Sequence, residues 1–100
     1  MIDSGAVEEA DIELCASGFD NLLMDAEQEE LRAYYPMLVE MGASKCAAVI
    51  KELLDWVDAN KEEDPLDVVE ADEKRCNELW DRYNAASVEE DPRKLAESLS

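Results

Sequence analysis

The stretch that decides the fold is SKCAAVIKELLDWV, residues 44–57. Its apolar residues recur at intervals of three, one, three and four positions, the spacing of one buried face of an α-helix. The face is formed by Cys46, Val49, Ile50, Leu53 and Val57, with Trp56 at its margin. Ser44 stands where a helix N-cap is expected. We therefore predict that this segment is the central helix of the core.

Upstream of this segment, a second helix is predicted between a capping box at Asp25 and Gln28 and a stop at Gly42. Its inner stripe consists of Leu31, Tyr34, Leu38 and Met41. Pro36 lies inside the stripe, and proline removes a backbone donor and clashes with the preceding turn. We therefore expect a kink or a break near Tyr35.

The first part of the chain also carries helical spacing. Ser4 or Asp3 is a candidate cap for a helix that reaches about Ala16, ended by Ser17 and Gly18. Its inner face is formed by Val7, Ala10 and Leu14, with Cys15 beside it. A short helical turn that returns to the core is then predicted at Phe19, Leu22 and Leu23.

Downstream, Asp64 and Pro65 supply a cap and a proline at the first helical position. One long helix is expected to follow, with an inner face of Leu66, Val69, Cys76, Leu79, Trp80 and Tyr83. Asp72 interrupts this face, either as a buried carboxylate that binds the start of a neighbouring helix or as a residue at the rim. A short last helix, carrying Leu95 and Leu99, is expected to start at Ser87 or at Asp91 and Pro92.

No segment alternates with the period of two that a half-buried strand requires. The expected architecture is all-α, a single compact irregular bundle of five or six helices. At 100 residues the chain is predicted to form one domain over 1–100, since two separate cores would each be too small to bury enough surface.

Charge is the unusual feature of the composition. The chain holds 27 acidic and 9 basic residues and no histidine, for a formal charge of -18. Residues 1–31 hold ten acids and no base, and residues 55–73 hold nine acids and one base. Direct binding to nucleic acid or to an anionic membrane is disfavoured, because such binding starts with Lys and Arg neutralising phosphates. A basic protein surface is the natural complement.

Within these two blocks, carboxylates recur three or four positions apart, which places neighbouring Cβ atoms about 5–6 Å apart on a helix. That distance is comparable with the spacing of phosphates along a nucleic-acid strand. The alternative is a merely solvated helix face, although a surface shaped for solubility normally mixes both signs. The predicted partner-binding residues are Glu8, Glu9, Asp11, Glu13, Asp20, Asp25, Glu27, Glu29, Glu30, Asp55, Asp58, Glu62, Glu63, Asp64, Asp67, Glu70 and Glu73.

Catalytic and cofactor motifs are missing from the sequence. The carboxylate pairs lie on predicted polar faces where nothing would raise one pKa, so we do not expect an enzyme. Three widely spaced cysteines, Cys15, Cys46 and Cys76, indicate reduced thiols in a cytoplasmic protein, with no metal and no other cofactor. Neither a secretory leader nor an apolar run long enough to span a membrane is present.

From Ser17 to Ala86 the chain resembles a family of small acidic helical bacterial domains that includes a DNA-mimic protein. The similar motifs are SGFD at residues 17–20, MGA at residues 41–43 before the apolar helix, and Asp72-Glu73 leading to Tyr83. The family pattern has a second glycine before the phenylalanine, where this chain has Ala16-Ser17-Gly18. In charge and size the chain is also similar to phage DNA mimics that inhibit restriction or CRISPR complexes.

Three functional hypotheses follow. The leading one is a nucleic-acid mimic that blocks the basic surface of a regulator, a nuclease or a CRISPR or restriction complex. The second is an immunity-type or adaptor protein that binds one basic partner through Tyr34, Tyr35 and Trp56 as apolar anchors. The third is an acidic chaperone or buffering protein. A homodimer is compatible with each of them.

Overall fold

The computed structural model describes residues 3–17 and 28–99. They form six helices and no strand, so the all-α bundle predicted from the sequence is confirmed. The bundle measures 38 × 24 × 21 Å along its principal axes. Its helices are α1 (Ser4–Ser17), α2 (Gln28–Met41), α3 (Ser44–Ala59), α4 (Pro65–Glu70), α5 (Glu73–Glu90) and α6 (Pro92–Leu99).

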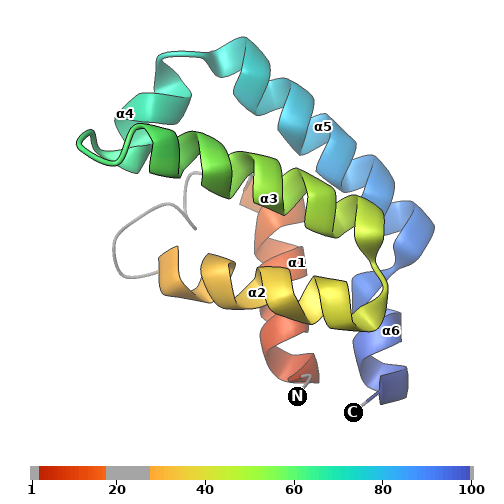
Figure 1. Ribbon diagram of the computed structural model, residues 1–100. Helices are drawn as coiled ribbons and strands as arrows, with labels where there is room; N and C mark the ends of the chain where they lie inside the picture. Colours follow the sequence, from red (N-terminus) through yellow and green to blue (C-terminus); the bar gives the residue numbers. More distant parts are fainter. Residues whose placement is uncertain (1–2, 18–27, 100) are drawn as a thin grey trace.

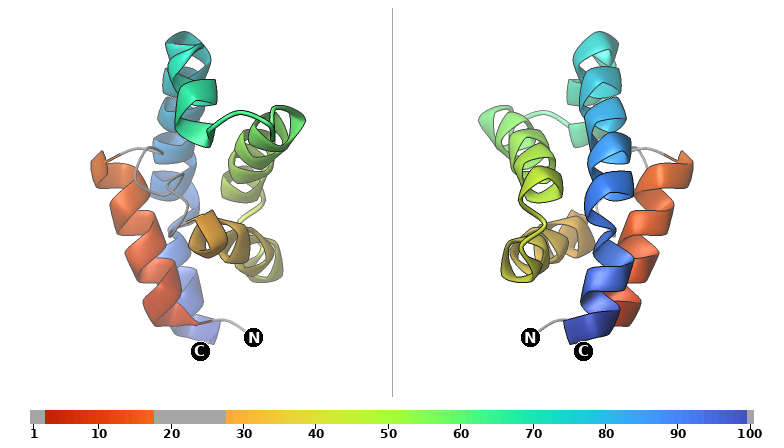
Figure 2. Two further views of the ribbon diagram at one scale, coloured as in Figure 1. Left: turned by 90° about the vertical axis from the view of Figure 1, so that its left-hand side faces the viewer. Right: turned by 90° about the vertical axis from the view of Figure 1, so that its right-hand side faces the viewer.

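Two groups of helices cross each other. The helices α1 and α6 lie side by side, and α2 crosses them, as Figures 1 and 2 show. The helix α3 turns back along α2 and packs on α5, while the short α4 links the far ends of α3 and α5. The start of α1 and the end of α6 therefore lie at one end of the molecule, and the α3–α4 connection lies at the opposite end (Figure 1).

The core is built from the apolar stripes predicted from the sequence. The central helix α3 buries Cys46, Val49, Ile50, Leu53 and Val57, and it also buries Trp56, which the sequence placed at the margin. The α2 stripe of Leu31, Tyr34, Leu38 and Met41 and the α1 stripe of Val7, Ala10 and Leu14 close on it. Among the three cysteines, which are free thiols, Cys46 is buried, and Cys15 and Cys76 are half-buried.

The turn between α2 and α3 follows the expected stop at glycine. Gly42 has a φ of +80°, which a residue without Cβ adopts without steric cost. The Ala43 amide donates to the Leu38 carbonyl at 2.9 Å, and the Gly42 amide donates to the Val39 carbonyl at 3.1 Å. This pair of bonds is the Schellman arrangement that satisfies the last carbonyls of a helix. The α2–α3 hairpin is therefore closed by local chemistry.

Of the kink or break expected near Tyr35, the break is wrong, because α2 continues through Pro36 from Gln28 to Met41. Pro36 is exposed, so water can satisfy the carbonyl that its missing N–H leaves without a donor. On the other side of the helix, Tyr34 and Leu38 are fully buried in one core. Packing on both sides of the proline therefore outweighs its local cost.

The single long helix expected after Asp64 is also wrong, since α4 ends at Glu70 and α5 begins at Glu73. Asp64 caps α4 as predicted, by accepting from the Leu66 amide at 3.0 Å. Asp72 is exposed and caps its own helix, with its carboxylate accepting from the Arg75 amide at 3.2 Å. The carboxylate that interrupted the apolar pattern thus marks the start of α5.

Two helix starts depend on residues near the end of α5. Ser44 does not cap α3 with its side chain; the Glu90 carboxylate accepts from the Lys45 and Cys46 amides at 3.1 and 2.8 Å instead. Asp91, at a φ of 47°, ends α5 and precedes α6, which begins at Pro92. Of the two predicted starts of the last helix, Asp91-Pro92 is confirmed and Ser87 lies inside α5. The turn predicted at Phe19, Leu22 and Leu23 and the cap at Asp25 lie outside the described residues.

Candidate functional site: two acidic surfaces and a buried carboxylate

The predicted partner-binding carboxylates fall into four groups in the structure. Glu13 and Glu30 are half-buried, and Asp11 is buried. Asp20, Asp25 and Glu27 lie outside the described residues. The exposed ones are Glu8, Glu9, Glu29, Asp55, Asp58, Glu62, Glu63, Asp64, Asp67, Glu70 and Glu73. Most of the expected set is therefore available at the surface.

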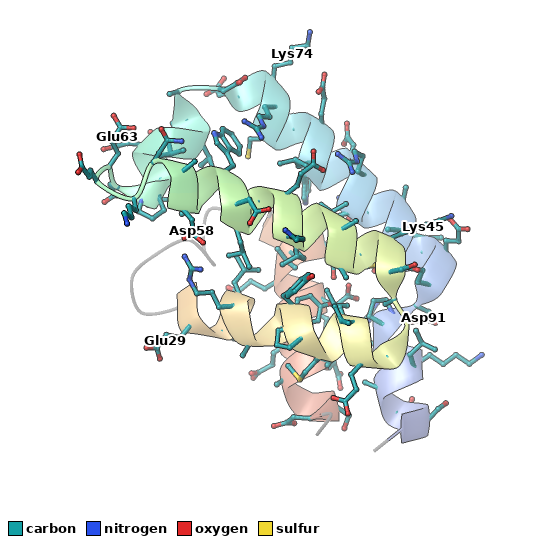
Figure 3. All side chains as sticks on the ribbon, viewed as in Figure 1. Glu29, Lys45, Asp58, Glu63, Lys74 and Asp91 are labelled. Atoms are coloured by element: carbon teal, nitrogen blue, oxygen red, sulfur yellow. The ribbon has the colours of Figure 1, made fainter. Side chains whose placement is uncertain are left out.

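The fold gathers one group of these carboxylates at a single end of the molecule. We call this surface the acidic end and define it as Glu29, Asp58, Glu62, Glu63, Asp64 and Asp67. The start of α2, the end of α3 and the α3–α4 connection meet there, and Figure 3 shows Glu29, Asp58 and Glu63 at the end opposite Lys45 and Asp91. Carboxylates from the two acidic blocks of the sequence thus share one surface.

An ion pair joins the two helices at this end. The Arg32 guanidinium on α2 binds the Asp58 carboxylate on α3 through two contacts, at 2.6 and 3.2 Å. The hydrogen bond from Arg32 holds the pKa of Asp58 below its ordinary range, so this carboxylate stays ionised at neutral pH. The pair therefore fixes the relative position of the acidic segments while it neutralises one of their charges.

The remaining carboxylates of the acidic end are less compensated. Over residues 3–17 and 28–99, no ion pair reaches Glu62, Glu63 or Asp67. Asp64 accepts a backbone hydrogen bond as the cap of α4 and stays exposed. By contrast, Asp55, nearby on α3, is paired with Lys51 at 2.9 Å. Lys61 lies on the α3–α4 connection and acts on Asp58, so the six carboxylates of the acidic end are accompanied by two cations, Arg32 and Lys61. The excess negative charge is thus concentrated on the α3–α4 connection and α4.

A second acidic surface lies on α1, where Glu8 and Glu9 are exposed with Ile12, whose exposed fraction is 45%. This first half of α1 lies toward the end of the molecule that is opposite α4 (Figure 1). The structure therefore does not merge the acids of α1 with the acidic end.

Asp11 is the one predicted surface residue that the structure places in the core, with an exposed fraction of 1%. The Tyr83 hydroxyl donates to its Oδ1 at 2.6 Å, and the Ser87 hydroxyl donates to the same atom at 2.8 Å. The other oxygen, Oδ2, accepts no hydrogen bond from the described residues, and the Arg93 Nε lies 3.0 Å from it as an ion pair. The prediction that Asp11 binds a partner is therefore wrong.

The hydrogen-bonded chain continues one step further from Asp11. Because Tyr83 donates to Asp11, its oxygen accepts from the Tyr34 hydroxyl, at 2.6 Å. Burial raises the pKa of both tyrosines, so both hydroxyls remain protonated donors. We call Asp11, Tyr34, Tyr83, Ser87 and Arg93 the Asp11 cluster. It joins α1, α2, α5 and α6 at one point.

A sequence signal for this cluster existed. Asp11 directly follows Ala10, lies four residues after Val7 and precedes Leu14 by three, so it shares their buried face. Its partners on α5 and α6 lie more than seventy positions away and could not be inferred from spacing.

Two of the three aromatic anchors proposed for an adaptor, Tyr34 and Trp56, are buried. Tyr34 is fully buried in the Asp11 cluster, and the exposed fraction of Trp56 is 8%. The Arg75 guanidinium also lies 4.5 Å from the centre of the Trp56 ring and covers it. Tyr35 is half-buried against the core. This is a correction to the adaptor hypothesis, since two of its three anchors are core residues.

Within the described part of the chain, no group of three or more Cys, Asp and Glu side chains is placed to hold a metal ion. No helix formed by these residues has the length and apolar character needed to cross a membrane.

The fold and surface define a class: a small helical protein whose exposed carboxylates are gathered on separate acidic surfaces. A family model described as DMP19-like protein matches residues 3–99, and the chain belongs to this family, which is a family of DNA mimics. A search of curated proteins found no match. A search of solved structures found none either.

Proposed function

We propose that this chain is a non-catalytic DNA mimic that occupies the basic, DNA-binding surface of a partner protein and blocks it. Membership of a DNA-mimic family supports the general class. The observation that carries the proposal is the acidic end, where exposed carboxylates from α2, α3 and α4 lie together with little compensation. The three free thiols support a cytoplasmic location for this role.

The repulsion among the carboxylates of the acidic end costs free energy of folding, which indicates that this surface is retained for binding and not for stability. Each pair of like charges at helical spacing costs about 0.2–0.5 kcal/mol, and the formal charge of -18 adds repulsion across the whole molecule. A stability device would instead intersperse Lys and Arg, as α3 and α5 do. The cost is offset when Lys and Arg of a partner, which otherwise hold phosphates, meet the carboxylates.

The partner classes are a transcription regulator, a nuclease, and a CRISPR or restriction complex. Each exposes a basic surface that binds DNA through phosphate contacts. An acidic field steers such a surface toward the mimic and raises the association rate, with an effect that falls as salt rises. The adaptor alternative is not favoured, because Tyr34 and Trp56 are buried.

A displacement experiment tests the proposal. The partner is captured from the native host, identified by mass spectrometry and loaded with a fluorescent DNA duplex. Adding the protein should displace the duplex roughly one for one, because both occupy the same basic surface. A ternary complex of partner, duplex and protein at saturation would contradict mimicry.

Charge reversal in matched pairs tests which surface is used. Glu62→Lys with Glu63→Lys changes the acidic end, and Glu78→Lys with Asp81→Lys changes exposed positions on α5 by the same net charge. The first pair should slow association roughly tenfold and flatten its salt dependence, and the second should have a much smaller effect. Equal effects of the two pairs would mean that only the total charge matters.

A third double variant tests the second acidic surface. Glu8→Lys with Glu9→Lys reverses the charge of two exposed side chains on α1, on the opposite side of the bundle from α4. If the acidic end is the contact surface, this variant should behave like the α5 control. A larger effect on α1 than at the acidic end would move the proposed contact to α1.

A further inference from the structure

A positively charged side chain, Lys61, lies in the middle of the acidic end. It belongs to the α3–α4 connection and is followed in the chain by Glu62, Glu63 and Asp64. Hollows of about 330 and 340 Å³ open on the surface here, and both are lined by Lys61, Asp58, Glu62 and Glu63. The Lys61 side chain is exposed. A partner that covers the acidic end therefore meets this ammonium together with the carboxylates around it.

A hydrogen-bonded turn holds Lys61 at this position. The Glu63 amide donates to the Asn60 carbonyl at 2.9 Å, so Lys61 and Glu62 are the two central residues of the turn. The Asn60 side-chain amide donates to the Trp56 carbonyl at 3.0 Å and ties the turn to the buried face of α3. The backbone at Lys61 is therefore anchored, while its side chain remains open to a partner.

Among the described residues, Lys61 has no counter-ion. Over residues 3–17 and 28–99 it forms no ion pair, although carboxylates surround it. Arg32, the other cation of the acidic end, is bound to Asp58 through two contacts. The pKa of Asp58 is lowered first by that hydrogen bond and then by the charge of Lys61, which acts without an ion pair. The charge of Arg32 is thus used within the fold, whereas the N–H donors of Lys61 are available.

An unpaired cation weakens a surface that binds by negative charge alone. Lys61 reduces the field that attracts Lys and Arg of a partner, and it repels any basic group directly opposite it. It is therefore a disadvantage for binding basic surfaces in general, but it discriminates among them. The favoured partner carries an acceptor group opposite Lys61 and basic groups around that acceptor.

Protein surfaces that bind specific DNA sequences have this arrangement. Their Lys and Arg side chains contact phosphates, while acceptor side chains among them read base edges. A carboxylate accepts from the amino group of cytosine, and the amide of Asn or Gln binds adenine. On DNA, each of these amino groups is a donor flanked by phosphates. Lys61 with Glu62, Glu63 and Asp64 presents the same combination of one donor and surrounding anions.

We propose that Lys61 is a specificity-determining residue of the acidic end: its ammonium takes the place of a base amino group and donates to an acceptor oxygen, of a carboxylate or an amide side chain, on the DNA-binding surface of the partner. The inference rests on the proposed function and deepens it. The carboxylates replace phosphates and supply the attraction, and Lys61 replaces one base edge and selects which basic surface is bound.

Binding of two targets by one lysine variant tests this role. The targets are the partner identified in the displacement experiment and poly-L-lysine, a basic chain without acidic or amide side chains. Lys61→Met should weaken binding to the partner roughly tenfold, because the partner's acceptor is buried without a donor. The same variant should bind poly-L-lysine at least as tightly as wild type does, since a positive charge has been removed. Isothermal titration calorimetry measures both affinities.

Two further variants serve as controls. Lys94→Met makes the same change at an exposed lysine on α6, away from the α3–α4 connection (Figure 1), and Lys94 also forms no ion pair with the described residues. It should leave both affinities within about twofold of wild type. Lys61→Arg keeps N–H donors at the same position and should retain partner binding within about threefold. Circular dichroism verifies that each variant folds.

The direction of the effect decides the outcome. If Lys61→Met binds the partner as tightly as wild type or more tightly, the acidic end acts through net negative charge and the inference is overturned, while displacement of DNA by the wild type still supports the proposed function. Equal weakening by Lys94→Met would also overturn it, because the effect would not belong to this position. A wild type that never displaces DNA sinks the proposed function, and this inference with it.

Discussion

The Asp11 cluster and the acidic end hold the same chemical group in opposite surroundings. Asp11 is 1% exposed and contacts two hydroxyl donors and a guanidinium drawn from α5 and α6. Glu62, Glu63 and Asp67 are exposed, and no described cation pairs with them. A buried carboxylate must be compensated within the fold, whereas an exposed one is solvated and stays available to a partner. Carboxylates of this chain therefore hold the fold together at one site and remain exposed at the other, where the proposed function places the contact with a partner.

The largest expected loss of stability comes from removing the buried carboxylate, and it contrasts with the loss from removing an exposed one. Asp11→Ala leaves the buried Tyr83 and Ser87 hydroxyls without their acceptor and Arg93 without its partner. It should lower the free energy of unfolding by about 3–5 kcal/mol. Urea titration followed by circular dichroism measures the loss. Glu9→Ala, two positions earlier on the exposed face, should change stability by no more than about 0.5 kcal/mol; equal losses would contradict the contrast.

The second prediction tests the hydrogen bonds that Tyr83 makes within the Asp11 cluster. Tyr83→Phe removes the hydroxyl that donates to Asp11 and accepts from Tyr34, and it leaves the ring in place. The free energy of unfolding should fall by about 1–3 kcal/mol, because two buried polar groups lose a partner. Tyr35→Phe, at a half-buried tyrosine, is the matched control in the same urea titration. A neutral Tyr83→Phe would show that Asp11 is satisfied without the tyrosines.

A third prediction concerns a half-buried carboxylate, Glu90, that accepts hydrogen bonds from backbone amides. Glu90→Ala removes the acceptor for the Lys45 and Cys46 amides at the start of α3, and should cost about 0.5–2 kcal/mol. Its neighbour Glu89 makes only an exposed ion pair with Lys45. Glu89→Ala should therefore cost less than about 1 kcal/mol in the same thermal or urea unfolding measurement. The reverse order would show that α3 is capped by other means.

The smallest expected change in stability comes from the ion pair between Arg32 and Asp58 at the acidic end. The pKa of Asp58 is lowered by the hydrogen bond from Arg32, so the stabilisation is complete above the ordinary aspartate pKa and is lost as pH falls through the lowered value. Both side chains are substantially exposed, at 39% and 51%, so solvent screening limits the contribution to about 0.2–1 kcal/mol. Asp58→Asn should differ from wild type by that amount at neutral pH, and the difference should disappear as pH falls below the lowered pKa of Asp58. A difference that persists in acid would point to a cause other than charge.

Local chemistry was readable in the sequence wherever a helix start or stop depends on neighbouring residues. The stripe from Cys46 to Val57, the glycine stop at Gly42 and the Asp64-Pro65 start all stand in the structure as predicted. The exposure of Glu62 and Glu63 followed from their polar, turn-rich surroundings. The family resemblance, which rested on short motifs, agrees with a family match over residues 3–99.

By itself, then, the sequence determined the helical fold class, the buried stripes of α1, α2 and α3 and the two acid-rich blocks, because spacing and charge act over a few residues. The division of the expected long helix into α4 and α5 was not predicted. Only the tertiary structure decided which carboxylates are compensated, since the partners of Asp11 and the amides capped by Glu90 lie more than forty positions away. It also decided that α2 continues through Pro36, where packing of Tyr34 and Leu38 outweighs a local penalty. The physical reason is that a buried charge, or the local cost of a proline within a helix, is compensated by whichever elements the fold brings next to it.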